Sequence, residues 1–474
     1  MSAFRLSGIV TALDDWIEEE ARFAAGAMLR AVSATQIIKE RPGFGQRIVP
    51  RPGSVVASPV LAAYDPDPDY FFHWFRDSAI IIDALRMALA EGFVDATSIE
   101  RLREFVDFNR GLRKLDGREF LRQGNFRKKV QPSFLQYVRP DDEIAAIFGD
   151  AVLAEARINP DGTLDFTRWA RPQNDGPALQ ALALTRWRDA EPNPDERLQA
   201  AMLELVIADL NFIEAHATER SFDIWEEESG YHYYTQLVQA EALACGAGWL
   251  AEMGDGARAR NCRSVASELD ASLSAYWSAA DGYCRSRIDV IGGAPSKALD
   301  ISVILGVLHA GRGAGTHSVL DSRTQATLTA LEDLFDAEYA LNHQRPPDQG
   351  PAMGRYAKDA YYGGNPWYLA TLGAAEFYFK LAIVLRSGAE MAVADDNVRF
   401  RERLAGKSPA KAAFERGDMF MRTVQAYTPP SGDLSEQFDR ATGAQTSAQR
   451  LAWSYAAFIT AAASRRQAAQ AIRD

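Results

Sequence analysis

Aromatic residues, arginines and carboxylates gather in six short stretches of the chain, each of which precedes an apolar segment. The stretches are Trp74–Asp77, Trp169–Gly176, Asp223–Glu228, Pro295–Lys297, Gly354–Trp367 and Ser435–Gln437. One stretch alone would be a solvated charge, a helix cap or core packing. Together they suit a sugar, because aromatic rings stack on the C–H faces of pyranoses while Asp and Arg bind hydroxyls in pairs. Two carboxylates that flank a glycosidic bond hydrolyse it without a metal or cofactor.

Other catalytic chemistries lack their residue patterns in this sequence. None of the six histidines forms a His-x-x-x-His pair, and there is no Gly-x-Ser-x-Gly motif or glycine-rich phosphate loop. The three cysteines, Cys245, Cys262 and Cys284, follow no metal or redox spacing, so we expect reduced thiols in a helical core. We therefore expect neither a metal nor a cofactor.

The composition is that of a globular protein with a large core. The 474 residues are 47% hydrophobic and carry a net charge of −12 without a long basic run, which argues against nucleic acid or an anionic membrane as partner. The sequence contains no run of 18 or more apolar residues, so we predict no transmembrane span. The weak apolar stretch Leu6–Leu13 has no clear cleavage site, so we expect a cytoplasmic protein. We also expect a monomer.

Hydrophobic periodicity predicts twelve helices of two alternating kinds. Six are amphipathic and six, such as those around Ile301–Gly311 and Trp453–Ala463, are apolar on nearly every side. A helix without a polar face must be covered all round, so we expect six inner helices wrapped by six outer ones, an all-α (α/α)6 barrel in a single domain over residues 1–474. The predicted ranges are 7–31, 76–92, 95–115, 174–190, 195–217, 229–254, 256–280, 298–311, 319–341, 365–388, 410–427 and 447–469, with an irregular stretch at 116–170 that has room for short strands.

The six polar stretches each enter an inner helix of this predicted barrel. In such a ring, those loops converge at one end and build a single pocket from distant segments. A repeat scaffold is the competing interpretation, but no residue-level repeat of fixed period is present.

The polar stretches also resemble the motifs of a known family. Taken in order, Asp69–Asp77, Trp169–Pro177, Asp223–Glu227, Gly354–Asp359 with Tyr361–Trp367, and Ser435–Asp439 are similar to those of the glucoamylases, glycoside hydrolase family 15. The resemblance extends over about residues 60 to 460. It implies an (α/α)6 barrel that releases β-glucose from the non-reducing ends of α-1,4-linked gluco-oligosaccharides with inversion of configuration.

The resemblance implies a role for each matching residue. Glu226 corresponds to the general acid and Glu436 to the general base. Arg76 with Asp77, and Arg355, correspond to the residues that hold the first glucose. The other substrate-binding positions implied are Tyr70, Trp74, Trp169, Trp225, Glu227 and Trp453, together with Arg171, whose backbone carbonyl and that of Trp225 correspond to contacts with sugar hydroxyls.

The two carboxyls need opposite protonation states. We expect like-charge repulsion from Asp223, Glu227 and Glu228, with burial beneath Trp225 and Trp169, to keep Glu226 protonated. Glu436 must be ionised. An inverting mechanism requires the carboxyls to be roughly 6.5–9.5 Å apart, with water between.

Three alternative functions remain open, and two accessory modules are not expected. A bulky Tyr231–Thr235 segment follows the acid, so an α-1,6-glucosidase or a trehalase of the same family is the nearest alternative. A non-catalytic sugar-binding barrel is a distant one, since both carboxylates are present. We expect no starch-binding module after the barrel and no β-sandwich before it, and hence a preference for soluble oligosaccharides.

Overall fold

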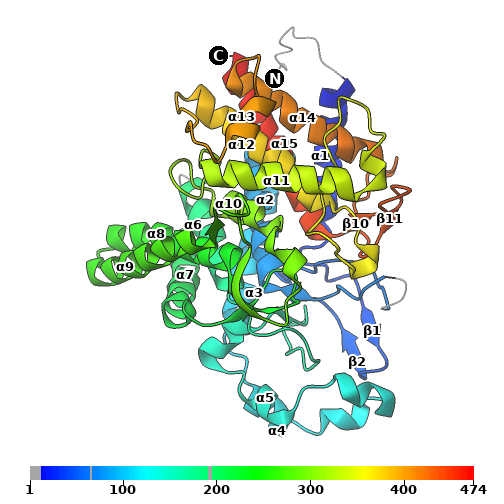
Figure 1. The fold of residues 1–474 in the computed structure, drawn as a ribbon. Coiled ribbons are helices and arrows are strands. Elements are labelled where there is room, and N and C mark those ends of the chain that lie inside the picture. Colours follow the sequence, from blue (N-terminus) through cyan, green and yellow to red (C-terminus); the bar gives the residue numbers. More distant parts are fainter. Residues whose placement is uncertain (1–11, 64–66, 191–194, 474) are drawn as a thin grey trace.

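A computed structural model describes residues 12–63, 67–190 and 195–473 of the chain. Twelve helices of 9 to 22 residues dominate this part, as the periodicity predicted (Figure 1). They are α1 (Ala12–Leu29), α2 (Phe75–Ala90), α3 (Ile99–Leu112), α6 (Gly176–Ala190), α7 (Glu196–His216), α8 (Tyr233–Glu252), α9 (Gly256–Leu273), α10 (Ser302–Ala310), α11 (Ser322–Glu338), α12 (Tyr368–Arg386), α14 (Pro409–Tyr427) and α15 (Ala452–Arg473). Three short helices, α4 (Gly117–Arg122), α5 (Asp141–Ala145) and α13 (Val398–Arg403), were not predicted.

Six of the long helices form a closed inner ring. Helix α2 packs on α6, α6 on α8, α8 on α10, α10 on α12, α12 on α15, and α15 again on α2. The other six lie outside: α1 packs on α15, α7 on α6, α9 on α8, α11 on α10 and α14 on α12, while α3 packs on α7. This arrangement confirms the predicted (α/α)6 barrel.

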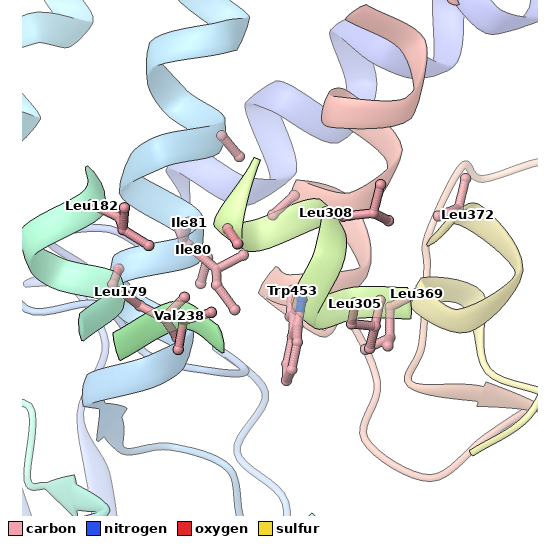
Figure 2. Close-up of a cluster of buried hydrophobic side chains, with 14 of the residues drawn as sticks. Ile80, Ile81, Leu179, Leu182, Val238, Leu305, Leu308, Leu369, Leu372 and Trp453 are labelled. Carbon is pink, nitrogen blue, oxygen red and sulfur yellow. The ribbon is translucent and has the colours of Figure 1, made fainter. Parts of the chain in front are cut away.

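Burial explains which helices are inner. Fourteen of the 19 residues of α12 are buried, whereas amphipathic α3 buries only one face, around Phe105. Helix α12 is also long and apolar enough to cross a membrane, with a mean hydropathy of 1.4, but 78% of that window is buried in the barrel. Inside the ring, Ile80, Leu179, Leu305, Leu369 and Trp453 meet from five helices (Figure 2). A core helix thus accounts for this apolar segment.

Short antiparallel strands shape the loops that enter the inner helices. They are β1 (Lys39–Arg41) with β2 (Gln46–Ile48), β3 (His73–Trp74) with β4 (Arg157–Ile158), β5 (Ser221–Phe222) with β6 (Ser229–His232) and β9 (Arg287–Ile291), β7 (Trp277–Ser278) with β8 (Tyr283–Cys284), and β10 (Gln437–Phe438) with β11 (Gln445–Thr446). Pairing places Trp74 opposite Arg157, and Gln437 opposite Thr446. These strands therefore fix distant loop segments against one another.

Several predicted helix boundaries were wrong. Residues 229–232 form β6 rather than the first turn of α8, because they pair with β9 more than 50 positions away. Likewise, residues 298–301 and 447–451 lie before α10 and α15, and β7 follows the end of α9. Residues 7–11 of the first predicted helix lie outside the described residues. The 116–170 stretch holds β4, as anticipated, and Cys284 lies on a strand instead of a helix.

Candidate active site

A cavity of about 240 Å³ lies where the loops converge at the N-terminal ends of the inner helices. It is lined by Ala57, Tyr70, Trp74, Arg76, Asp77, Trp169, Ile224, Trp225, Glu226, Glu227, Arg355, Tyr361, Trp367, Glu436, Leu451 and Trp453. Eleven of the twelve site residues selected from the sequence are in this lining. Both candidate catalytic carboxylates, Glu226 and Glu436, are thus brought to one pocket.

Glu226 lies in the tight loop between β5 and β6. The Asp223 carboxylate accepts hydrogen bonds from the backbone N–H groups of Trp225, Glu227 and Glu228 at 3.3, 2.8 and 3.0 Å, which closes the loop. Glu226 itself has a φ of +66°, a left-handed conformation that costs a non-glycine residue about 1 kcal/mol or more. The loop therefore holds a strained backbone in order to aim this side chain into the pocket.

Four N–H donors surround the Glu226 carboxylate. The Trp74 indole donates to Oε1 at 2.7 Å, and the Gln173 amide donates to the same oxygen at 2.8 Å. The Trp169 indole donates to Oε2, and an Arg76 nitrogen lies 3.3 Å from Oε1. These contacts engage both oxygens and fix the orientation of the carboxyl in the pocket.

The three carboxylates expected to repel Glu226 all lie in ion pairs, which weakens that repulsion. The Lys297 ammonium lies 2.6 Å from both Asp223 and Glu227. Although burial alone would raise it, Lys297 holds the pKa of Asp223 below its usual range. Glu228 pairs with Arg287. The Glu226 side chain is only 13% exposed and contacts the Trp169 indole, although Trp169 itself is 38% exposed.

Glu436 has a different environment, directly before the β10–β11 hairpin. It is 3% exposed, and burial raises its pKa to about 7. The Ser447 hydroxyl donates a hydrogen bond to Oε2 and, with Arg355, partly offsets that rise. Ser447 adopts a left-handed φ of +62°, so this partner is also held by a strained backbone. The Tyr70 hydroxyl also lies beside the carboxyl, which lines the pocket.

Two arginine–aspartate pairs flank the carboxylates. Arg76 Nε lies 3.5 Å from Asp77 Oδ2, and Asp175 holds another nitrogen of Arg76 at 3.3 Å. Burial raises the pKa of Asp77 to about 6. Arg355 binds both oxygens of Asp359, at 2.7 and 2.6 Å. Within the described part of the chain, Arg76 Nε and Asp77 Oδ2 have no hydrogen-bond partner, so hydroxyls of a ligand would complete them.

Aromatic side chains form most of the remaining wall. The Tyr70 and Tyr361 hydroxyls are 2.6 Å apart, and Trp225 is stacked near Trp453 with centroids 6.5 Å apart. The Trp225 indole donates to Asp300 at 3.0 Å, and burial raises the pKa of Asp300 to about 7. Such a wall presents ring faces together with polar edges, which suits a pyranose.

The lining includes residues that sequence reasoning missed. Tyr361 and Trp367 lie in the quoted motifs, but no role was given to them. Lys297 lies in one of the six polar stretches, while Gln173 and Asp359 lie inside two more. Their position in those stretches was the available signal. Their roles depend on partners that are far away in the sequence, which the sequence alone does not show.

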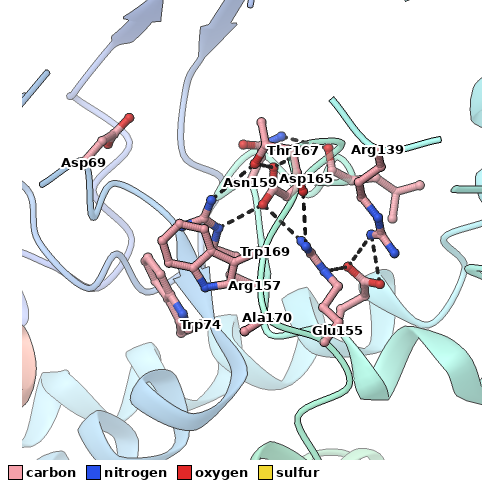
Figure 3. A network of polar contacts seen from close by, with 12 residues as sticks. Asp69, Trp74, Arg139, Glu155, Arg157, Asn159, Asp165, Thr167, Trp169 and Ala170 are labelled. Carbon is pink, nitrogen blue, oxygen red and sulfur yellow. Dashed lines mark hydrogen bonds and ion pairs between the residues drawn. The ribbon is translucent and has the colours of Figure 1, made fainter. Parts of the chain in front are cut away.

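Arg171 is the one predicted residue that does not line the pocket. Its side chain binds Glu155 and lies 3.1 Å from Asp165, in a buried network that Figure 3 shows beside Trp169. Asp165 also holds Arg157 at 2.9 Å, and the Arg157 guanidinium lies 3.5 Å from the centre of the Trp169 ring. The network therefore supports the exposed indole from behind. Arg171 and Trp169 both line an adjoining groove of about 500 Å³.

Comparisons with known proteins agree with this geometry. The family model of the glycosyl hydrolases family 15 matches residues 151–463. The glucoamylase of Blastobotrys adeninivorans is 27% identical over 460 residues, covering 88% of this chain and 68% of that protein. The probable glucoamylase of Schizosaccharomyces pombe is 28% identical, covering 95% and 91%. The structure of the family 15 glucoamylase from Hypocrea jecorina superimposes with a TM-score of 0.78 at 28% identity, covering 96% of this chain and 72% of that one.

Proposed function

Because the chain belongs to the glycosyl hydrolases family 15, we propose that it is an exo-acting glucan 1,4-α-glucosidase that removes glucose from non-reducing chain ends. The observation that carries this proposal is the single pocket that contains both Glu226 and Glu436. At about 240 Å³ it is smaller than the roughly 300–1,000 Å³ of sites for larger ligands. A pocket of this size accepts one terminal sugar, which accounts for exo action.

Glu226 is the proposed general acid. The bond that breaks joins the first glucose to the leaving sugar, so the glycosidic oxygen must approach this carboxyl. Three neutral groups donate hydrogen bonds to Glu226, and Trp169 is the most exposed of these residues. We expect the substrate to replace the hydrogen bond that the Trp169 indole makes. The leaving sugar then lies beside Trp169, at the edge of the adjoining groove.

Glu436 is the proposed general base. Ser447 occupies one oxygen, which leaves Oε1 to take a proton from the attacking water. The electron pair of the broken bond goes to the leaving oxygen, which receives its proton from Glu226. With water on the opposite face of the sugar, the anomeric carbon inverts and β-glucose forms.

The remaining lining positions the first glucose. Arg76, Asp77 and Arg355 offer donors and acceptors to ring hydroxyls in the geometry of paired hydrogen bonds. Glu227 is bound by Lys297 at 2.6 Å and by Arg355 at 2.8 Å, so it lies fixed next to the acid. Sugar units beyond the cleaved bond would extend from Trp169 along the groove, past the exposed Arg168.

A substrate panel tests the proposed function. Purified protein should release glucose from maltose and longer α-1,4 oligomers faster than from isomaltose or trehalose. Arg168→Ala should raise KM for maltoheptaose and leave maltose unchanged. Preferential cleavage of isomaltose or trehalose would overturn the linkage assignment, and sugar binding without turnover would overturn the enzyme assignment.

The compartment and oligomeric state are proposed from the sequence. A cytoplasmic location agrees with the three free cysteines among the described residues. Cell fractionation tests it, and recovery in the culture medium would contradict it. Light scattering should give a mass near the 52.2 kDa of one chain, whereas twice that mass would contradict a monomer.

A further inference from the structure

A second cavity, of about 330 Å³, lies inside the inner ring on the other side of Trp453 from the catalytic pocket. We call it the bore cavity. It exists because α10 has 9 residues, whereas the other inner helices have 15 to 22, so α10 stops before it can fill the ring. Small side chains at Gly373, Ala456 and Ala457 leave the space open. Figure 2 shows Trp453 beside the short helix α10.

The bore cavity has an apolar end and a polar end. Ile80, Leu179 and Leu305 line it near Trp453. At the far end, Asp83 binds Arg186 at 2.7 Å, and Glu376 binds Lys380 at 2.9 Å. The Lys380 side chain is 29% exposed, so this end reaches solvent on the face opposite the catalytic loops.

The charges of the lining balance. Three carboxylates, Asp83, Glu91 and Glu376, face three cations, Arg86, Arg186 and Lys380. His309, which also lines the cavity, is neutral, because burial lowers its pKa to about 3. An ion would find no excess of opposite charge. A neutral molecule with hydroxyls would find donors and acceptors at one end and a ring face with aliphatic side chains at the other.

This is the same set of groups that the catalytic pocket offers: arginine–carboxylate pairs and tryptophan. We propose that the bore cavity is a second binding site for one neutral pyranose, namely free glucose. The identity of the ligand rests on the proposed function, in which glucose is the product and accumulates around the enzyme.

Trp453 couples the two sites. In the described part of the chain it is the one residue that lines both cavities. Its ring is stacked near Trp225, and the Arg76 guanidinium lies 5.7 Å from its centre. Glucose in the bore cavity therefore contacts the back wall of the catalytic pocket. We expect it to lower kcat without competing with substrate, in addition to any competitive inhibition at the catalytic pocket.

Calorimetric titration of glucose tests the site when the catalytic pocket is blocked by a pseudotetrasaccharide inhibitor, which is too large for the bore cavity. The blocked enzyme should still bind one glucose per chain. Ala457→Phe, at a half-buried position of the lining, should weaken this binding about tenfold or more, while Gln470→Phe, exposed on the same helix and outside the lining, should not. Lys380→Ala, which removes one polar partner, should weaken it as well and serves if Ala457→Phe does not fold.

No glucose binding to the blocked enzyme, at concentrations well above the competitive inhibition constant, would overturn the proposal. So would undiminished binding by folded Ala457→Phe or Lys380→Ala. The titration does not need turnover, so a failure of the proposed function would show separately, as an enzyme that binds glucose in the bore cavity but hydrolyses no maltose.

Discussion

Glu226 and Glu436 line one pocket, yet the loop at 223–228 and the hairpin that follows Glu436 give the two carboxyl groups different surroundings. Glu226 accepts hydrogen bonds from Trp74, Trp169 and Gln173 and lies near Arg76. Glu436 is buried beside the Ser447 and Tyr70 hydroxyls, and burial raises its pKa to about 7. The first environment fixes the position of a carboxyl with several donors, and the second disfavours the charged form of one by burial.

The proposed reaction needs a proton on Glu226 and a charge on Glu436. The difference teaches that the two roles depend on different contacts: several donors fix the position of Glu226, whereas burial acts on the charge of Glu436. A substrate that displaces the Trp169 contact brings its glycosidic oxygen to Glu226. An attacking water beside Glu436 restores part of the solvation that burial removed.

The largest expected effect separates the acid from the base. Glu226→Gln should lower kcat/KM for maltose by about 10²–10⁴-fold, because the leaving sugar then departs without a proton. On α-glucosyl fluoride, whose leaving group needs no proton, Glu226→Gln should keep most of the activity of the unsubstituted enzyme. Glu436→Gln should lose a similar factor on both substrates. Equal losses of Glu226→Gln on the two substrates would contradict the acid assignment.

Removing the cation beside the acid loop has the next largest effect. Lys297→Met leaves the buried Asp223 carboxylate without its cation, while Glu227 keeps Arg355, and this should cost about 3–5 kcal/mol of unfolding free energy. Urea denaturation measures this, with exposed Lys411→Met as the control. A loss of less than 1 kcal/mol would show that the loop does not depend on Lys297.

From the raised pKa of Glu436 we predict a substitution that stabilises the protein, in contrast to the loss expected for Lys297→Met. The unfolded group has a pKa of 4.5, so its contribution to stability is full below pH 4.5 and is lost as pH rises through about 7. The glutamine of Glu436→Gln stays neutral at every pH. At pH 8 the unfolding free energy of this variant should therefore exceed that of the unsubstituted protein by up to about 3 kcal/mol. Near pH 4 the two should be alike. If Glu436→Gln were less stable than the unsubstituted protein at pH 8, the raised pKa of a buried Glu436 would be refuted.

The smallest effect concerns the hydroxyl on Glu436. Ser447→Ala removes a hydrogen bond that lowers the pKa of Glu436, so the acidic limb of kcat/KM should move to higher pH. At pH 6 the activity should fall roughly fivefold, and at pH 8 much less. Ser454→Ala, whose hydroxyl donates to the Ser435 carbonyl, is the control. An unshifted profile would mean that Ser447 does not tune the base.

The sequence predicts the barrel well because its signals are local and strong. Helices such as α12 are apolar all round, and the polar stretches mark where each inner helix begins. Eleven of twelve selected residues reach the pocket for that reason. Pairings between distant segments were not predictable: Lys297 neutralises Asp223 across 74 positions, and β6 displaces a helical turn by pairing with β9. The side chain of Arg171 binds Glu155 outside the pocket lining, and the predicted contact of its backbone carbonyl stays a prediction.

The central claim is that Glu436 directs water to the face of the sugar opposite Glu226. The anomer of the first-formed glucose tests it most directly, by proton NMR during the first moments of maltose hydrolysis, before mutarotation. The account predicts β-glucose. Initial release of α-glucose would mean that Glu436 attacks the anomeric carbon itself and that water then opens the covalent intermediate from the side of the departed sugar, which would contradict it.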